Sequence, residues 1–91
     1  MEKRKKLPCE IFSINLRLER QLKGLTQKYM ADKLFIEVGT YSKWENGRRE
    51  PGLYGVASLA RILGVPIDTF FDEDTAAKEA RYKEQMKTGN A

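Results

Sequence analysis

The 91-residue sequence contains no histidine and a single cysteine, Cys9. Without histidine, the chain lacks the most common general base, the most common metal ligand and any Ser-His or Cys-His nucleophile pair. One cysteine forms neither an internal disulfide nor, without histidine, a zinc site, and its free state fits a reducing compartment. A glycine-rich phosphate loop is also missing. We therefore expect a protein that is not an enzyme and uses no metal or cofactor.

Long apolar runs are absent as well, because no stretch approaches the roughly 20 residues that a membrane-spanning helix needs. The basic N-terminus, MEKRKKLPCEIF, is not followed by the apolar segment of a signal peptide. These features predict a cytoplasmic protein without membrane contact. With 41% apolar residues, the chain has enough apolar side chains for one small globular domain.

Positive charge is concentrated in the first half of the chain. Residues 1–51 contain 12 Lys or Arg and 7 Asp or Glu, whereas residues 52–91 contain 5 and 6. This distribution is typical of a domain that binds a polyanion with one face. Asp72, Glu73 and Asp74 form an acidic cluster, which we interpret as solvated rather than catalytic.

Apolar residues recur at three- and four-residue steps along most of the chain, which predicts an all-α fold. Gly24 stands at the expected end of the first helix, and Thr26 is a good N-cap for the second. The expected buried face of the second helix consists of Tyr29, Met30 and Leu34. Helices are expected over residues 10–23, 27–34, 38–46, 53–63 and 67–71.

The two ends of the chain differ from this central part. Residues 1–9 are expected to form a basic, flexible arm, because contiguous like charges repel one another. Residues 10–72 form the expected folded domain. Residues 73–91 are an expected polar tail that forms at most a marginal helix, because it has few side chains to bury: Ala76, Ala80, Tyr82 and Met86.

Short motifs recur in a fixed order through the central part of the sequence. These motifs are Thr26-Gln27, Ala31, Trp44-Glu45-Asn46-Gly47, Pro51, Leu59-Ala60 and Leu63-Gly64-Val65. In this order and spacing, over about residues 11–71, the sequence resembles the Cro/C1-type (XRE) helix-turn-helix family. The resemblance implies a compact five-helix, lambda-repressor-like helix-turn-helix domain that binds double-stranded DNA, here with a basic N-terminal arm and a short C-terminal tail.

The resemblance also implies which residues contact DNA. A helix over about residues 38–46 would enter the major groove, whose width admits one α-helix. The family's base-contacting positions correspond to Val38, Gly39, Thr40 and Lys43. Its phosphate-contacting positions correspond to Gln27, Asn46, Arg48 and Arg49.

Other residues of the motif have an implied structural role. Arg20 and Glu45 match an ion pair that ties the first helix to the third in relatives. Tyr41 and Trp44 lie three positions apart on the third helix, and we expect both to pack in the core. The small Ala31 suits a close crossing of the second and third helices.

Three features depart from the family pattern. Phe35 occupies the turn position that usually holds glycine, so it must accept strain at positive φ or impose another turn. Glu37 replaces the usual Ser or Thr N-cap of the third helix, although its charge suits the helix dipole. Val38 and Gly39 form no hydrogen bonds to bases through their side chains. Lys43 is then the main polar contact, most naturally to guanine.

Family members typically dimerise through their C-terminal helices, which places two recognition helices about 34 Å apart on successive major grooves. The corresponding apolar residues here are Ile67, Phe70 and Phe71, with Leu53 and Tyr54 nearby. The alternative role for this set is completion of the monomer core, which we expect at least of Ile67 and one phenylalanine. The leading hypothesis is a homodimeric repressor that binds a pseudo-palindromic operator and excludes polymerase.

Two other functions fit the same sequence. In the first, the chain is a protein-binding module such as the antitoxin of a toxin–antitoxin pair. Residues 73–91 would then fold on a protein partner, and DNA binding would be secondary. In the second, the helix-turn-helix is retained only for assembly.

Overall fold

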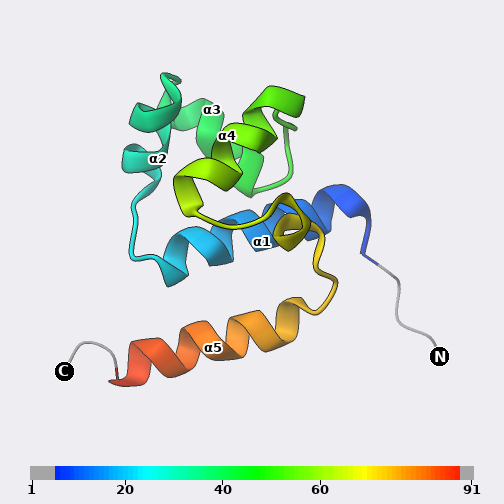
Figure 1. Cartoon of the computed structure of the whole chain (residues 1–91), viewed down its shortest axis with the longest axis vertical. Coiled ribbons are helices and arrows are strands. Elements are labelled where there is room, and N and C mark those ends of the chain that lie inside the picture. Colours follow the sequence, from blue (N-terminus) through cyan, green and yellow to red (C-terminus); the bar gives the residue numbers. More distant parts are fainter. Residues whose placement is uncertain (1–5, 89–91) are drawn as a thin grey trace.

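The computed structural model describes residues 6–88, and every regular element in this range is helical. The all-α prediction is confirmed, whereas residues 1–5 of the expected arm lie outside the described range. Helices α2, α3 and α4 lie together on one side of α1, and α5 runs along its other side (Figure 1). In chain order the elements are α1 (Pro8–Leu22), α2 (Gln27–Leu34), α3 (Val38–Glu45), α4 (Leu53–Leu63), the 3-10 helix η1 (Ile67–Phe71) and α5 (Thr75–Thr88).

Helix α1 begins at Pro8, two residues earlier than expected, so Pro8 and Cys9 are helical rather than part of the arm. Proline suits the first helical position because its φ is fixed near the helical value and its missing N–H would have no partner there. The preceding Leu7 is extended, and its N–H donates to the Glu10 carboxylate at 2.8 Å. No helix within residues 6–88 is both long enough and apolar enough to cross a bilayer.

Helix α2 has the predicted N-cap and a strained C-terminus. The Thr26 hydroxyl accepts a hydrogen bond from the Tyr29 N–H at 3.0 Å. At the other end, Phe35 adopts the left-handed conformation with φ 59°, so this residue accepts the strain at the usual glycine position. The next N–H, from Ile36, donates to the Ala31 carbonyl at 3.1 Å and closes the turn.

The predicted buried face of α2 is wrong for Tyr29. Met30 is fully buried and Leu34 packs against the core, but Tyr29 is exposed, with the Lys33 Nζ 5.5 Å from its ring centre. Successive residues of a helix point about 100° apart, so a side chain next to Met30 leaves the narrow face that this short helix buries.

The core lies among α1, α2, α3, α4 and η1. Tyr41 and Trp44 belong to it as predicted, with ring centres 6.0 Å apart. Phe70 is fully buried and lies 5.4 Å from the Phe12 ring, but Ile67 remains 43% exposed, so the prediction that it completes the core is wrong. A five-residue 3-10 helix offers one narrow face to α1, which Phe70 fills. The buried core residues are Phe12, Leu16, Met30, Ala31, Tyr41, Trp44, Leu59, Ala60, Leu63 and Phe70.

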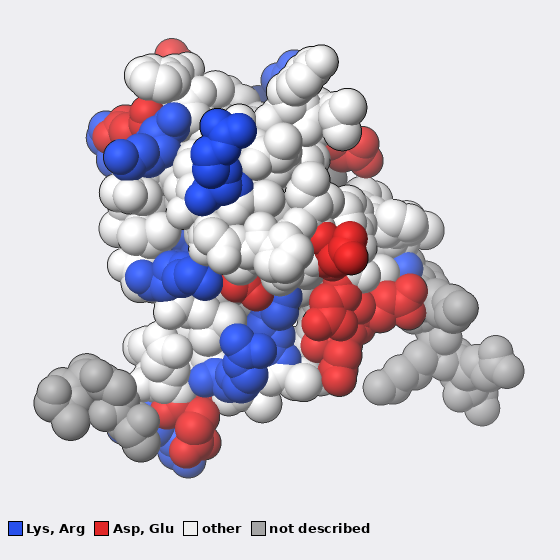
Figure 2. Space-filling view, viewed as in Figure 1, with Lys and Arg blue, Asp and Glu red and all other residues white. Residues whose placement is uncertain are grey.

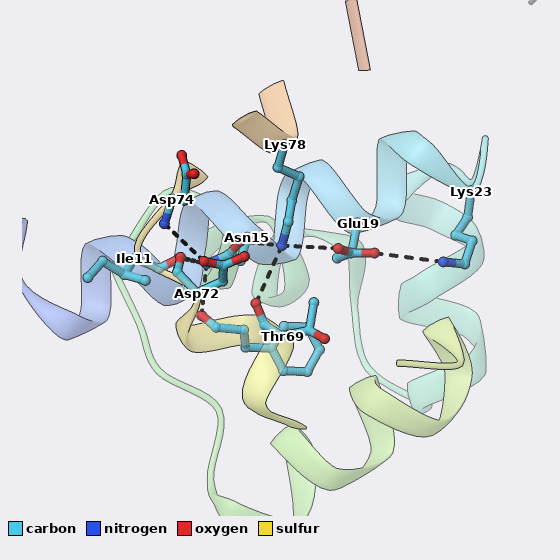
Figure 3. A network of polar contacts seen from close by, with 9 residues as sticks. Ile11, Asn15, Glu19, Lys23, Thr69, Asp72, Asp74 and Lys78 are labelled. Atoms are coloured by element: carbon cyan, nitrogen blue, oxygen red, sulfur yellow. Dashed lines mark hydrogen bonds and ion pairs between the residues drawn. The ribbon is translucent and has the colours of Figure 1, made fainter. Parts of the chain in front are cut away.

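Helix α5 packs on α1 through polar rather than apolar groups. Its buried residues are Thr75 and Lys78, whereas the four residues expected to be buried are exposed, apart from a partly buried Tyr82. The Lys78 side chain points from α5 toward Asn15 and Glu19 of α1 (Figure 3). Burial of a charged side chain is tolerated when the charge is paired and hydrogen-bonded. The pattern of apolar residues along α5 therefore did not predict that Lys78 is buried.

The buried network around Lys78 also joins α1 to η1. The Lys78 ammonium lies 3.0 Å from the Glu19 carboxylate, donates to the Asn15 side-chain carbonyl, and lies 3.4 Å from the Thr69 carbonyl oxygen. The Asn15 amide nitrogen lies 3.1 Å from the Phe70 carbonyl oxygen and 2.9 Å from that of Asp72. One asparagine therefore fixes both η1 and the chain that leads into α5 (Figure 3).

Candidate nucleic-acid interface

Helix α3 presents the four predicted base-contacting residues on its outer side. Val38, Gly39 and Lys43 are exposed and Thr40 is partly exposed. A Cβ built on Gly39 would meet no atom within 4 Å, so a binding partner can approach the backbone closely at this position. The structure therefore brings the four residues together on one accessible face.

A fifth residue shares this face and was missed from the sequence. Ser42 lies four positions after Val38 and three after Gly39, so helical spacing places it on the same side. It is partly exposed, and its hydroxyl can donate or accept a hydrogen bond. The signal was the helical period itself, which places Ser42 between Val38 and Gly39 around the helix axis.

The inner side of α3 is fixed by the carboxylate of Glu45. This group accepts hydrogen bonds from Arg20 Nε at 2.6 Å, Arg20 Nη2 at 3.0 Å, Gln27 Nε2 at 3.0 Å and the Tyr41 hydroxyl at 2.5 Å. Arg20 Nη1 also donates to the Leu25 carbonyl at 2.8 Å. The predicted Arg20–Glu45 pair is therefore present, and it is the centre of a cluster, here called the Glu45 cluster, that joins α1, α2 and α3.

The Glu45 cluster perturbs the protonation of its members. Burial alone would raise the pKa of the Glu45 carboxyl, but the hydrogen bonds from Arg20, Tyr41 and Gln27 outweigh it and leave this pKa below the ordinary value. The hydrogen bond to Glu45 raises the pKa of Arg20. Burial, together with the bond to Glu45, raises the pKa of the Tyr41 hydroxyl. At neutral pH the cluster is therefore a carboxylate held by a guanidinium and a phenol.

Gln27 is both a member of the Glu45 cluster and a predicted phosphate ligand. Its side-chain nitrogen carries two N–H groups, and one of them donates to Glu45. Gln27 is the first residue of α2, where the backbone N–H groups of a helix favour an anion. Its amide is thereby oriented from inside the fold before any phosphate arrives.

The three other predicted phosphate ligands lie just after α3. Asn46, Arg48 and Arg49 are all exposed. The Arg48 N–H donates to the Lys43 carbonyl at 2.9 Å and lies 3.3 Å from the Asn46 side-chain oxygen. Gly47 permits this tight turn with φ 79°. The turn holds two guanidinium groups next to the C-terminal end of α3.

A group of acidic side chains lies elsewhere in the fold, on the connection between η1 and α5. On the face shown in Figure 2, the largest group of acidic side chains lies near the connection between η1 and α5. Asp72, Glu73 and Asp74 of this connection are exposed, and the Asp74 carboxylate accepts the Ala77 N–H at 3.1 Å at the start of α5. Among residues 6–88, no three metal-binding side chains come close enough together to hold an ion.

The fold resembles that of two solved structures. The clp gene regulator ClgR from Corynebacterium glutamicum matches with a TM-score of 0.72 and 24% identity, over 91% of this chain and 88% of that chain. The hypothetical transcription factor NHTF from Neisseria matches with a TM-score of 0.71 and 20% identity, over 88% and 92% of the two chains. At these identities the likeness concerns the fold alone.

Two sequence relatives match about two thirds of the chain at higher identity. The chain is 43% identical over 58 residues to YqaE, an uncharacterized HTH-type transcriptional regulator of Bacillus subtilis (strain 168), covering 64% of this chain and 50% of YqaE. It is 41% identical over 58 residues to the prophage-derived uncharacterized regulator YonR of the same organism, covering 64% and 54%. The chain spans about half the length of these relatives.

The family model described as helix-turn-helix matches residues 16–70, which include α2, α3 and every member of the Glu45 cluster. This region holds both the outward face of α3 and the groups that fix its inner side. The chain therefore belongs to the Cro/C1-type (XRE) helix-turn-helix family.

Proposed function

We propose that the chain is a DNA-binding transcription regulator that places α3 in the major groove. The observation that supports this most directly is the division of α3 into two sides. Its outer side carries accessible residues at Val38, Gly39 and Lys43, and its inner side is fixed to α1 and α2 by Glu45. A helix that is fixed from behind and open in front meets the requirement of a groove-reading element.

In this proposal the residues around α3 divide into two roles. Val38, Gly39, Thr40 and Lys43 contact base edges, with Lys43 as the main polar contact. The amide of Gln27, the side chain of Asn46 and the guanidinium groups of Arg48 and Arg49 contact phosphates on either side of the groove.

A matched pair of variants tests these roles. Duplexes that bind the full chain are first selected from a random DNA pool. On the selected site, Lys43→Ala is expected to cost about 1–3 kcal/mol and to relax the preference at one base position. Arg48→Ala is expected to weaken binding to all sequences alike and to lower the salt slope by about one. An equal loss from Lys43→Ala on every sequence would contradict its base-contacting role.

We further propose that the regulator acts as a homodimeric repressor on a pseudo-palindromic operator, by excluding polymerase. Phe70 is not available for the expected dimer interface, because it is fully buried in the monomer core. Ile67 and Phe71 remain about half exposed, and Phe71 borders an open apolar hollow of about 200 Å³. The hollow is lined by Pro8, Cys9, Phe12, Glu50, Pro51, Val56 and Phe71.

Sedimentation of the full chain tests this assembly. A dimer that Phe71→Asp converts into a monomer is expected, together with lost binding to the full site and retained weak binding to a half-site. A monomeric wild-type chain would contradict it. The alternative of a protein-binding tail has less support, because α5 is folded against α1 of its own chain.

A further inference from the structure

Phe35 combines two features that the folded chain does not explain. Among residues 6–88 it is the one non-glycine residue with positive φ, and its side chain is 94% exposed. For a bulky residue this conformation is strained, because Cβ approaches the backbone too closely. The hydrogen bonds of the turn, from the Phe35 N–H to Asp32 and from the Ile36 N–H to Ala31, use backbone atoms alone. Glycine would form the same turn without strain.

The ring itself gains nothing from the fold. An apolar side chain stabilises a protein by leaving water, and a side chain that remains almost fully in water does not do so. Backbone strain that the fold does not require indicates that Phe35 serves binding to another molecule rather than folding.

The position of Phe35 indicates what that role is. It lies in the turn that leads into the N-terminal end of α3, three residues before Val38, which is also exposed. Val38 has no hydrogen-bonding side chain, so a contact made by its side chain is apolar. In the major groove the apolar feature of a base pair is the thymine C5-methyl group.

We propose that Phe35 packs its ring on a thymine methyl group beside the base pair that Val38 contacts. The inference rests on the proposed function, because it requires α3 to enter the groove. It makes Phe35 a specificity-determining residue at a position where the family usually has glycine. The strain at this turn is then the consequence of keeping an aromatic ring where DNA can meet it.

The test compares Phe35→Gly with the wild type in stability and in DNA binding. The melting temperature is expected to rise by about 2–6 °C, because relief of strain exceeds the extra freedom that glycine gives the unfolded chain. Affinity for the selected duplex is expected to fall about fivefold or more, because the apolar contact is lost. Opposite changes in stability and affinity are not expected of a merely structural residue.

Removing the methyl group from the DNA identifies the partner atom. Each thymine of the selected site is replaced in turn by deoxyuridine. At one position deoxyuridine is expected to lower the affinity of the wild type about fourfold, whereas the affinity of Phe35→Gly is expected to be the same with thymine and with deoxyuridine there. Phe35→Ala, which keeps a Cβ at the strained position, is expected to show the lower affinity without the gain in stability. Met86→Ala, which truncates another exposed apolar side chain, serves as the unchanged control.

Each other outcome overturns the inference. Unchanged affinity of Phe35→Gly would show that the ring does not contact DNA. A loss that is equal with thymine and deoxyuridine at every position would assign the ring to the sugar–phosphate backbone instead. A wild-type chain that binds no duplex would overturn the proposed function itself, and the inference with it.

Discussion

Two neighbouring residues of α1 connect it to different parts of the molecule. Arg20 binds Glu45 of α3, and Glu19 binds Lys78 of α5. The N···O distance is 2.6 Å in the first ion pair and 3.0 Å in the second, and both pairs are supplemented by neutral hydrogen-bonding groups. The second pair is buried at both side chains, whereas Arg20 in the first is partly buried. Tyr41 supplements the first, and Asn15 supplements the second.

The two ion pairs differ in what happens when they break. Helix α3 lies in the middle of the fold and contributes Tyr41 and Trp44 to the core, so it cannot leave without global unfolding. Helix α5 is the last described element and packs mainly on α1, so it can detach and return Glu19 and Lys78 to water. The same chemistry therefore stabilises the whole fold in one place and sets the position of one helix in the other.

The largest effect is expected from Glu45→Ala. Removing the carboxylate leaves the Arg20 guanidinium and the Tyr41 hydroxyl without their shared partner in a buried site. Loss of one member of a buried ion pair costs about 3–5 kcal/mol, a large fraction of the total stability of a small domain. Urea denaturation measures the loss, and Glu45→Gln, which keeps the shape and one acceptor, is expected to lose less. A loss below about 1 kcal/mol would show that the cluster is not essential to the fold.

Acid is expected to weaken the Glu45 cluster selectively. The pKa of Glu45 in the folded chain lies below the ordinary value of 4.5, so its contribution to stability is complete above that value. This contribution is lost as the pH falls through the lower folded pKa. The stability gap between wild type and Glu45→Gln should therefore narrow in acid. Urea denaturation of both proteins at several pH values measures this gap, and a gap that widens in acid would contradict the sign.

A smaller effect is expected from Lys78→Met. The variant leaves Glu19 with Lys23 Nζ, 3.7 Å away, as its remaining cationic partner, and detachment of α5 returns that carboxylate to water. The loss of stability is therefore expected to remain below the about 3–5 kcal/mol of a pair that cannot detach. Hydrogen exchange in α5 should become faster while DNA affinity stays within about twofold. Lys83→Met, which changes an exposed lysine of the same helix, is the control.

The smallest effect is expected for the coupling between the two ion pairs. They share the backbone of α1 but no side chain, and changes without shared partners usually add within about 0.3–0.5 kcal/mol. The double variant Glu45→Gln and Lys78→Met should therefore lose the sum of the two single losses. A coupling above about 1 kcal/mol, measured by the same denaturation series, would show that α1 transmits a change from one ion pair to the other.

The sequence predicted the first of these two regions but not the second. Arg20 and Glu45 could be identified because the family motif fixes their register, and Phe35 was recognised because a bulky residue stands at a glycine position. The partners Asn15 and Lys78 are 63 residues apart, and nothing local marks either as buried. Periodicity finds apolar faces, and it assigns a lysine in a polar helix to solvent.

The candidate interface shows the same division. The family register located the outward positions of α3, including Lys43, and their exposure agrees with it. The hydrogen bond from Gln27 to Glu45 was not predicted, because it depends on the side-chain directions of two helices. Tyr29 was assigned to the buried face of its helix and Ile67 to the core because both side chains are largely apolar, but short helices bury only a narrow face.

The burial of Lys78 also has a practical chemical consequence. Only 4% of this residue is exposed, whereas Lys83 on the same helix lies in solvent. An amine-reactive reagent modifies a lysine only when its nitrogen is accessible, so Lys78 should react only during the moments when α5 is detached. The labelling rate of Lys78 in the unaltered chain, compared with that of Lys83, thus measures how often the C-terminal helix detaches.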